Sequence, residues 1–217
     1  MSDKFNKIYE RSISNPENFW DEAANDIFWF KKPTKILNKS NPPFYKWYED
    51  GITNTCYNAL DIHIDQGNGK RTALIYDSPI TGNKSKFSYE ELRSKVSLFA
   101  GALRDQGVNK GDRVIIYMPM IPEAVVAMLA CARIGAIHSV VFGGFASNEL
   151  ASRIDDSKAK VLVTASCGFE PGRTVEYKPL VDEAIKLANH KIDKMILFQR
   201  SGHEVKLNAP KEVSWEE

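Results

Sequence analysis

The sequence predicts an α/β fold, built as a doubly wound parallel sheet with helices on both faces. Three observations support this prediction. From residue 72 onward, short apolar segments of strand length alternate with longer segments of helical spacing. Two of the short segments, 114–117 and 161–164, are almost continuously apolar, which is typical of strands buried on both faces of a parallel sheet. Glycine, proline or a capping residue separates most of the segments.

The first 69 residues are aromatic-rich and irregular. Asn15 and Pro16 predict a helix start, with Asn15 as the cap and Pro16 at the first helical position. An apolar stripe with helical spacing follows, and Pro33 is expected to end this helix. Residues 41–48 contain two prolines and predict an extended arm that carries aromatic side chains. A second, short helix is expected over about 55–64, before a glycine-rich stretch.

The rest of the chain is expected to alternate between strands and helices. Strands are predicted over 72–76, 114–117, 137–142, 161–164 and 195–198. Helices are predicted from the capping box at Ser88 to Gly107, over 123–134 between Pro122 and Gly135, from a cap at Ser147, and from Pro179. We therefore expect a leader over residues 1–69 and a larger α/β domain over residues 70–217.

Composition and charge argue against several classes of partner. The 217 residues carry 29 basic and 28 acidic side chains, so nothing points to nucleic acid or an anionic membrane as a partner. No stretch approaches the roughly 18 apolar residues that a membrane span needs. The N-terminal residues have no signal or transit pattern, so a cytoplasmic location is expected. Cys56, Cys131 and Cys167 are far apart and predict buried free thiols.

The first candidate site follows the strand at 137–142. Ligands of open α/β sheets gather at the carboxyl ends of strands. Phe142, Gly143 and Gly144 lie at such an end, and paired glycines let a ligand or another backbone approach closely. A tight turn is the simpler interpretation. The third glycine of a dinucleotide fingerprint is missing, which disfavours a nicotinamide oxidoreductase.

The second candidate site is the turn formed by Glu170, Pro171, Gly172 and Arg173, after the strand at 161–164. The Pro-Gly pair favours a tight turn that would hold Arg173 at its tip, where a guanidinium can fork onto a phosphate. Lys178 could add a second positive charge. The alternative is a surface ion pair from Arg173 to Glu170 or Glu176, and the residues alone leave both interpretations open. We expect the two candidate sites at the ends of neighbouring strands.

Histidines and cysteines add no further site. His138 is predicted to be a core histidine within a strand, and the other three histidines have no metal-ligand spacing. Cys167 has no nearby base to activate it as a nucleophile. The sequence therefore predicts neither a catalytic residue nor a metal ligand, and residues 81–85 are interpreted as a hairpin turn.

Several sequence blocks, in order, resemble the AMP-forming acetyl-/propionyl-CoA synthetases of the adenylate-forming superfamily. They are 41–44 (NPPF), 57–61 (YNALD), 111–119 (GDRVIIYMP), 130–136 (ACARIGA) and 140–145 (VVFGGF). The resemblance covers essentially the whole chain. The acetate branch usually has an arginine where Glu170 stands, and together with 153–157 (RIDDS) this favours the propionyl-CoA synthetase branch.

The resemblance implies a two-step ligase reaction that uses propionate or acetate, ATP, CoA and Mg²⁺. The carboxylate attacks the α-phosphate of ATP to give an acyl-adenylate and pyrophosphate, and the CoA thiol then displaces AMP. It also implies that residues matching Glu170, Pro171, Gly172 and Arg173 contact the 3′-phosphate and adenine end of CoA. Phe142, Gly143 and Gly144 are implied to line the neighbouring CoA surface.

By the same resemblance, the ATP and Mg²⁺ sites and the catalytic lysine are expected beyond residue 217. The sheet is then incomplete, with an acetyl-CoA synthetase-type leader over 1–69 and the first part of the AMP-binding domain over 70–217. This chain is expected to be inactive as a ligase by itself. The alternative is a non-catalytic CoA-binding or interaction module.

Overall fold

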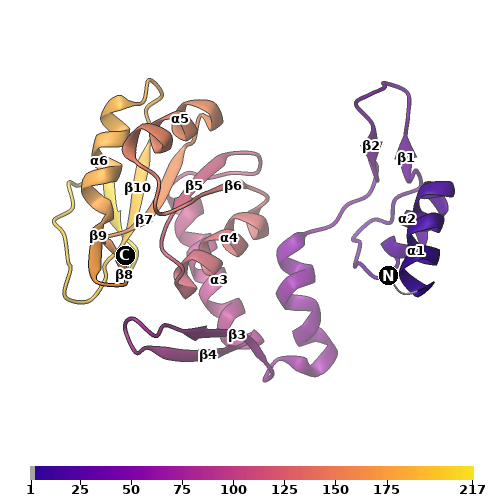
Figure 1. Ribbon diagram of the computed structural model, residues 1–217, viewed down its shortest axis with the longest axis horizontal. Helices are drawn as coiled ribbons and strands as arrows, with labels where there is room; N and C mark the ends of the chain where they lie inside the picture. The colour runs from indigo at the N-terminus through magenta and orange to yellow at the C-terminus, as the bar shows by residue number, and fades with distance from the viewer. Residues whose placement is uncertain (1–2) are drawn as a thin grey trace. The chain divides into compact units, whose positions relative to one another are not determined.

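The computed structural model describes residues 3–217. They divide into two compact units, the described residues up to Asn54 and Thr55–Glu217. The first unit contains helices α1 (Asp3–Ser14) and α2 (Pro16–Ala24) and a short antiparallel pair, β1 (Leu37–Asn38) and β2 (Lys46–Trp47). Figure 1 shows these elements at the N-terminal end of the chain.

Helix α2 begins as predicted and ends earlier than predicted. The Asn15 side chain accepts a hydrogen bond from the Asn18 N–H at 3.3 Å, and Pro16 is the first helical residue. The helix stops at Ala24 instead of continuing toward Pro33. The Ala24 carbonyl accepts the Trp29 indole N–H at 2.8 Å and the Ile27 N–H at 3.3 Å, so the chain tightens into a turn there.

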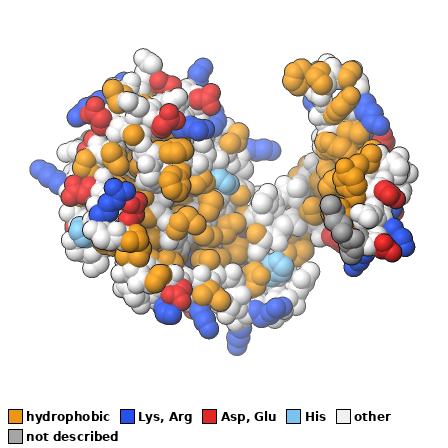
Figure 2. All heavy atoms as spheres, viewed as in Figure 1, with side chains coloured by type: hydrophobic (Ala, Val, Ile, Leu, Met, Phe, Trp, Pro, Cys, Tyr) orange, Lys and Arg blue, Asp and Glu red, His pale blue; other side chains and the backbone are white. Residues whose placement is uncertain are grey.

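Two other features of the first unit differ from expectation. Helix α1 was not predicted, although Phe5, Ile8, Tyr9 and Ile13 have helical spacing. All four side chains are exposed on this unit, where Figure 2 shows hydrophobic side chains at the surface. Residues 41–48 are not helical, as predicted, but they are not an extended arm, because Lys46 and Trp47 pair with Leu37 and Asn38 in the β1–β2 hairpin.

The second unit opens with helical turns that include π-helix, η1 (Tyr57–Asp61) and η2 (Ile64–Asn68). The predicted short helix is therefore confirmed, and it continues to the glycine-rich stretch. An antiparallel hairpin of β3 (Thr72–Asp77) and β4 (Lys84–Ser88) follows, with the predicted turn between its strands.

A five-stranded, wholly parallel sheet forms the centre of the second unit, which confirms the predicted fold class. Its order is β11-β10-β7-β5-β6. The strands are β5 (Arg113–Tyr117), β6 (Ile137–Val141), β7 (Val161–Ala165), β10 (Lys194–Phe198) and β11 (Glu212–Ser214). The predicted strand at 195–198 is therefore not the last one, because β11 pairs beside it.

Helices cover both faces of this sheet (Figure 1). They are α3 (Tyr89–Asp105), α4 (Pro122–Ile134), α5 (Ser147–Ser157) and α6 (Tyr177–Leu187). Alternate residues of β5 point to opposite faces. Val114 and Ile116 belong to the core that contains α3 and α4, whereas Ile115 and Tyr117 belong to the core that contains α5 and α6. A strand buried on both faces must be apolar throughout, which explains the continuous run.

Most helix starts and ends of this unit follow the predictions, including the start of α4 at Pro122, and two depart from them. Ser88 and Glu91 form the predicted capping box of α3, Gly107 follows the end of that helix with a φ of +83°, and Gly135 ends α4 with a φ of +74°. Ala146, not Ser147, is the residue before α5. Helix α6 starts at Tyr177, before Pro179. A proline is tolerated there because N–H groups of the first turn have no helical partner.

The three cysteines are free and buried, as predicted. Within residues 3–217, no helix has both the length and the apolar character needed to cross a membrane.

Candidate functional site

Both candidate segments border one cavity at the carboxyl edge of the parallel sheet. The cavity has a volume of about 390 Å³, which is within the range of small-molecule sites. Phe142, Gly143 and Gly144 line it together with Glu170 and Gly168. The structure therefore brings the double-glycine turn and the base of the second candidate turn to a single ligand-sized space.

The expectation that the two candidates follow neighbouring strands is wrong. In the sheet, β5 lies between β6 and β7. The segments still meet, because β7 is followed by an antiparallel hairpin of β8 (Cys167–Glu170) and β9 (Arg173–Glu176). The alternation of strands and helices could not reveal this hairpin, which was expected to be a loop.

Two buried tyrosines contact the double-glycine turn on the side of the protein core. The Tyr117 hydroxyl lies 2.7 Å from the Phe145 carbonyl oxygen and 3.2 Å from the Gly143 carbonyl oxygen, and donates to this pair. The Tyr177 ring lies 4.9 Å from the Tyr117 ring. A Cβ added at Gly143 would lie 2.1 Å from the Tyr177 hydroxyl, and one added at Gly168 would lie 3.0 Å from it. Tyr177 therefore packs against both the double-glycine turn and β8, and this packing requires glycine at position 143.

The Pro171-Gly172 turn is confirmed, and so is the ion-pair alternative for Arg173. Gly172 has a φ of +75°, which permits the two-residue connection between β8 and β9. Two nitrogens of Arg173 donate to one carboxylate oxygen of Glu170, at 2.6 and 2.7 Å. The Arg173 side chain is 70% exposed, so this pair is screened by water and contributes little to stability. Arg173 is accessible to a ligand, but it does not line the cavity.

Lys178 does not supply the second positive charge that the sequence suggested. Its ammonium group is buried, at 2.6 Å from Asp182 and 3.1 Å from Glu212. Burial by itself would lower the pKa of Lys178, but hydrogen bonds to both carboxylates outweigh burial and raise it. Lys178 therefore joins α6 to β11 and is not available to a ligand.

His138 is not the predicted core histidine. It lies on β6, the edge strand of the sheet, and is exposed. The periodicity of a short apolar run cannot distinguish a central strand from an edge strand. Cys167 is buried, and burial raises the pKa of its thiol, so the thiolate needed for nucleophilic attack is disfavoured.

Arg200 is a cavity residue that the sequence patterns did not single out. It follows β10, lines the 390 Å³ cavity, and its guanidinium carbon lies 4.7 Å from the centre of the Phe169 ring. The available signal was an arginine two residues after an apolar strand run, since such positions face the ligand edge of a parallel sheet.

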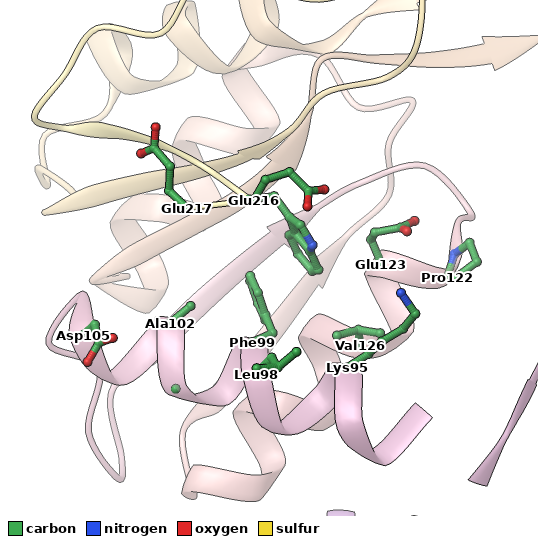
Figure 3. A pocket seen from close by; sticks show the side chains of 12 residues that line it. Lys95, Leu98, Phe99, Ala102, Asp105, Pro122, Glu123, Val126, Glu216 and Glu217 are labelled. Carbon is green, nitrogen blue, oxygen red and sulfur yellow. The ribbon is translucent and has the colours of Figure 1, made fainter. Parts of the chain in front are cut away.

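A second cavity, of about 420 Å³, lies between α3, α4 and the end of the chain. Figure 3 shows Phe99 and Val126 among its apolar lining residues and Glu123, Glu216 and Glu217 around it. Trp215 stacks on Phe99 with ring centres 3.8 Å apart. With Asp105 also present and Lys95 as the one lining cation, this cavity would repel a phosphate ligand.

We expect Gly143→Ala to lower the free energy of unfolding by about 1–3 kcal/mol, the usual cost of overpacking. The new methyl would overlap the buried Tyr177 hydroxyl. Urea unfolding of the full chain measures this effect. Tyr177→Phe removes the nearest atom, so the double variant should recover part of the loss.

Gly101→Ala is the matched control for Gly143→Ala. Gly101 lies in α3 with nothing within 4 Å of an added Cβ, so alanine there should stabilise the chain by about 0.5–1 kcal/mol. If Gly143→Ala behaves like Gly101→Ala, Tyr177 does not constrain the turn.

Comparisons with known proteins connect this geometry to a family. A family model described as AMP-binding enzyme matches residues 63–216, and one described as acetyl-coenzyme A synthetase N-terminus matches residues 5–59. The chain is 53% identical over 210 residues to "Acyl-CoA synthetase short-chain family member 3, mitochondrial" of Rattus norvegicus, and this match covers 96% of the chain and 31% of that protein. It is 46% identical to the acetyl-coenzyme A synthetase of Streptomyces coelicolor, with 97% and 32% covered.

A solved structure shows the same fold. The acetoacetyl-CoA synthetase from Streptomyces lividans aligns with a TM-score of 0.83 and 25% identity, over 95% of this chain and 31% of that one. The chain thus spans about a third of the length of the relatives it matches.

Proposed function

Because the chain belongs to the AMP-binding enzyme family, we propose that it is the leading segment of an acid–thiol ligase that makes short-chain acyl-CoA from a carboxylate, ATP and CoA. One structural observation carries the proposal for this segment. The double-glycine turn and the β8–β9 hairpin, two segments that the family resemblance assigns to CoA, border the same cavity. We keep residues 1–69 as a leader and 70–217 as the first part of the AMP-binding domain.

In this proposal the nucleotide half of CoA lies over the double-glycine turn and the β8–β9 hairpin. Gly143 and Gly144 border the cavity, although Tyr177 and Phe142 occupy the space that their side chains would take. Arg173 supplies a forked contact to the 3′-phosphate. The phosphate has to displace Glu170 from Arg173, because the two side chains are paired in the free chain. Glu170 therefore weakens CoA binding relative to a neutral residue at this position.

Calorimetric titration of the full chain with CoA tests this proposal. Heat of binding that is reduced by Arg173→Ala supports it. The proposal fails if the wild-type chain gives no binding heat and the Arg173→Ala chain behaves identically.

The acid substrate is proposed to be propionate, with acetate as the second choice, because Glu170 stands where the acetate branch usually has arginine. ATP and Mg²⁺ are proposed partners of the whole protein. Residues 3–217 contain no group of three or more His, Cys, Asp or Glu side chains that could hold a metal ion. A cytoplasmic location completes the proposal, in contrast to the mitochondrial location in the name of the rat relative.

We expect the 217-residue chain by itself to show no ligase turnover. Its sequence lacks the Ser/Thr/Gly-rich phosphate loop that the family resemblance leads us to expect. The measurement is AMP formation from ATP with propionate and CoA. AMP formation above background that depends on both propionate and CoA would contradict this expectation. CoA binding without turnover is also what the alternative, a non-catalytic CoA-binding module, predicts. Continuation of the reading frame into a phosphate loop separates the two.

A further inference from the structure

Arg200 is held rigidly at the carboxyl edge of the sheet. The residue is 9% exposed, and its backbone N–H donates to the Ser166 hydroxyl at 2.8 Å. Its guanidinium lies over the face of Phe169, at 4.7 Å from the ring centre. A cation over the face of an aromatic ring is attracted to it, which favours this position of the guanidinium. Arg200 lines both the 390 Å³ cavity and the adjoining cavity of about 660 Å³.

The charges around the 390 Å³ cavity leave Arg200 without a counter-ion. Three charged side chains line this cavity: Asp77, Glu170 and Arg200. Asp77 is paired with Lys84 at 2.9 Å, and Glu170 is paired with Arg173 at 2.6 Å. Within residues 3–217, no carboxylate lies within 4.0 Å of the Arg200 guanidinium, and no hydrogen bond from it to the protein is formed.

Arg200 is nine-tenths buried as a residue, and its guanidinium keeps some contact with solvent but has no anionic partner within residues 3–217. Loss of hydration around a charge without an anionic partner is costly. An anion in the cavity would offset that cost. The positive charge is felt nearby: burial is the main cause that raises the pKa of Tyr177 to about 12, and Arg200 acts against this rise. The cavity wall therefore favours a negatively charged group next to Arg200.

We propose that Arg200 binds a phosphate group of the nucleotide ligand, as an anion subsite separate from Arg173. The planar fork of arginine matches two phosphate oxygens, and Phe169 holds that fork in place. Arg173 is exposed at the tip of the hairpin, whereas Arg200 is buried in the cavity wall, so the two contact different parts of a ligand. The inference rests on the proposed function only for the identity of the molecule that carries the phosphate, CoA or ATP.

Side-chain NMR on the unaltered chain tests the site directly. The Arg200 Nε–Hε signal, assigned by its loss in Arg200→Gln, is followed during titration with inorganic pyrophosphate, CoA and ATP. We expect it to shift with pyrophosphate and with one of the two nucleotides. Because the protein measured is wild type, a folding defect in the variant cannot explain the result.

Calorimetry then measures the contribution of Arg200. Loss of a charge-assisted hydrogen bond lowers affinity about tenfold, so Arg200→Gln should weaken binding of the nucleotide that shifts the Arg200 signal about tenfold. Arg104→Gln is the matched control, because Arg104 is exposed on α3 and its side chain makes no ion pair with any described residue. Arg200→Lys keeps the charge but not the forked geometry, so its nucleotide affinity should lie between those of Arg200→Gln and Arg104→Gln.

The outcomes show whether the phosphate belongs to CoA or to ATP, and they distinguish the anion subsite from the proposed CoA site. A loss confined to CoA assigns the phosphate to CoA, and a loss confined to ATP assigns it to ATP. If wild-type chain binds no CoA, the proposed CoA site fails, while a pyrophosphate shift at Arg200 still supports the anion subsite. An Arg200 signal that none of the three probes moves overturns the subsite. The subsite is also overturned if the Arg200→Gln chain binds each ligand of the wild-type chain as tightly as the Arg104→Gln chain does.

Discussion

Arg173→Ala is expected to weaken CoA binding by about 100-fold. Two effects add: the variant loses a forked, charge-assisted contact to phosphate, and no positive charge then lies near Glu170 to offset its repulsion of that phosphate. The first is worth about 1.5–3 kcal/mol, and each 1.4 kcal/mol is a factor of about ten. Calorimetric titration of the full chain with CoA, at fixed salt, measures the change.

Glu170→Gln separates the two effects. It frees Arg173 from its ion pair and removes a negative charge, so CoA should bind several-fold more tightly than to wild type. The double variant Glu170→Gln/Arg173→Ala should bind CoA more tightly than Arg173→Ala alone. Arg104→Ala, at an exposed position on α3, controls for loss of a positive charge in general. An Arg173→Ala loss no larger than that of Arg104→Ala would remove Arg173 from the site.

Lys178→Met is expected to lower the free energy of unfolding by about 3 kcal/mol, since breaking a buried ion pair leaves a buried carboxylate without its partner. The Lys178 side chain is 6% exposed and that of Glu212 is 13% exposed, so neither charge regains much hydration. Asp182 is more exposed, at 37%, and contributes less to the loss. Urea unfolding at neutral pH measures this change in the free energy of unfolding.

Lys186→Met is the matched control on the same helix. Its ammonium group is exposed and lies 4.0 Å from Glu183, so the change in stability should stay within about 0.5 kcal/mol. Because Lys178 joins α6 to β11, its loss should also expose β11 to hydrogen exchange. Equal effects of the two substitutions would show that the buried ion pairs do not stabilise this edge of the sheet.

Lys178 illustrates what a sequence alone leaves undecided about a charged residue. In the sequence it is a cation five residues after a candidate phosphate-binding arginine, which suggests a shared site. In the structure it pairs with Glu212 of β11, a strand that no pattern predicted because its three residues are too few to establish a period. A partner from a distant segment decides the role of such a residue, and no local rule contains that partner.

The sequence by itself determined the elements whose causes are local. The Ser88–Glu91 capping box, the left-handed glycine after α4 and the apolar run of β5 each require only neighbouring residues, and each was predicted. The α/β alternation then specified a parallel sheet covered on both faces. The positions of the double-glycine turn and the Pro171-Gly172 turn likewise follow from the placement of glycine and proline along the chain.

Only the tertiary structure decided strand order, pairing partners and which charges remain available. It placed β5 between β6 and β7, folded the second candidate loop into a hairpin and paired Arg173 with Glu170. It also buried Arg200 with no counter-ion among residues 3–217. The physical reason is the range of the interactions. Caps and turns are set within a few residues, whereas strand order and ion pairing depend on contacts between segments far apart in the chain.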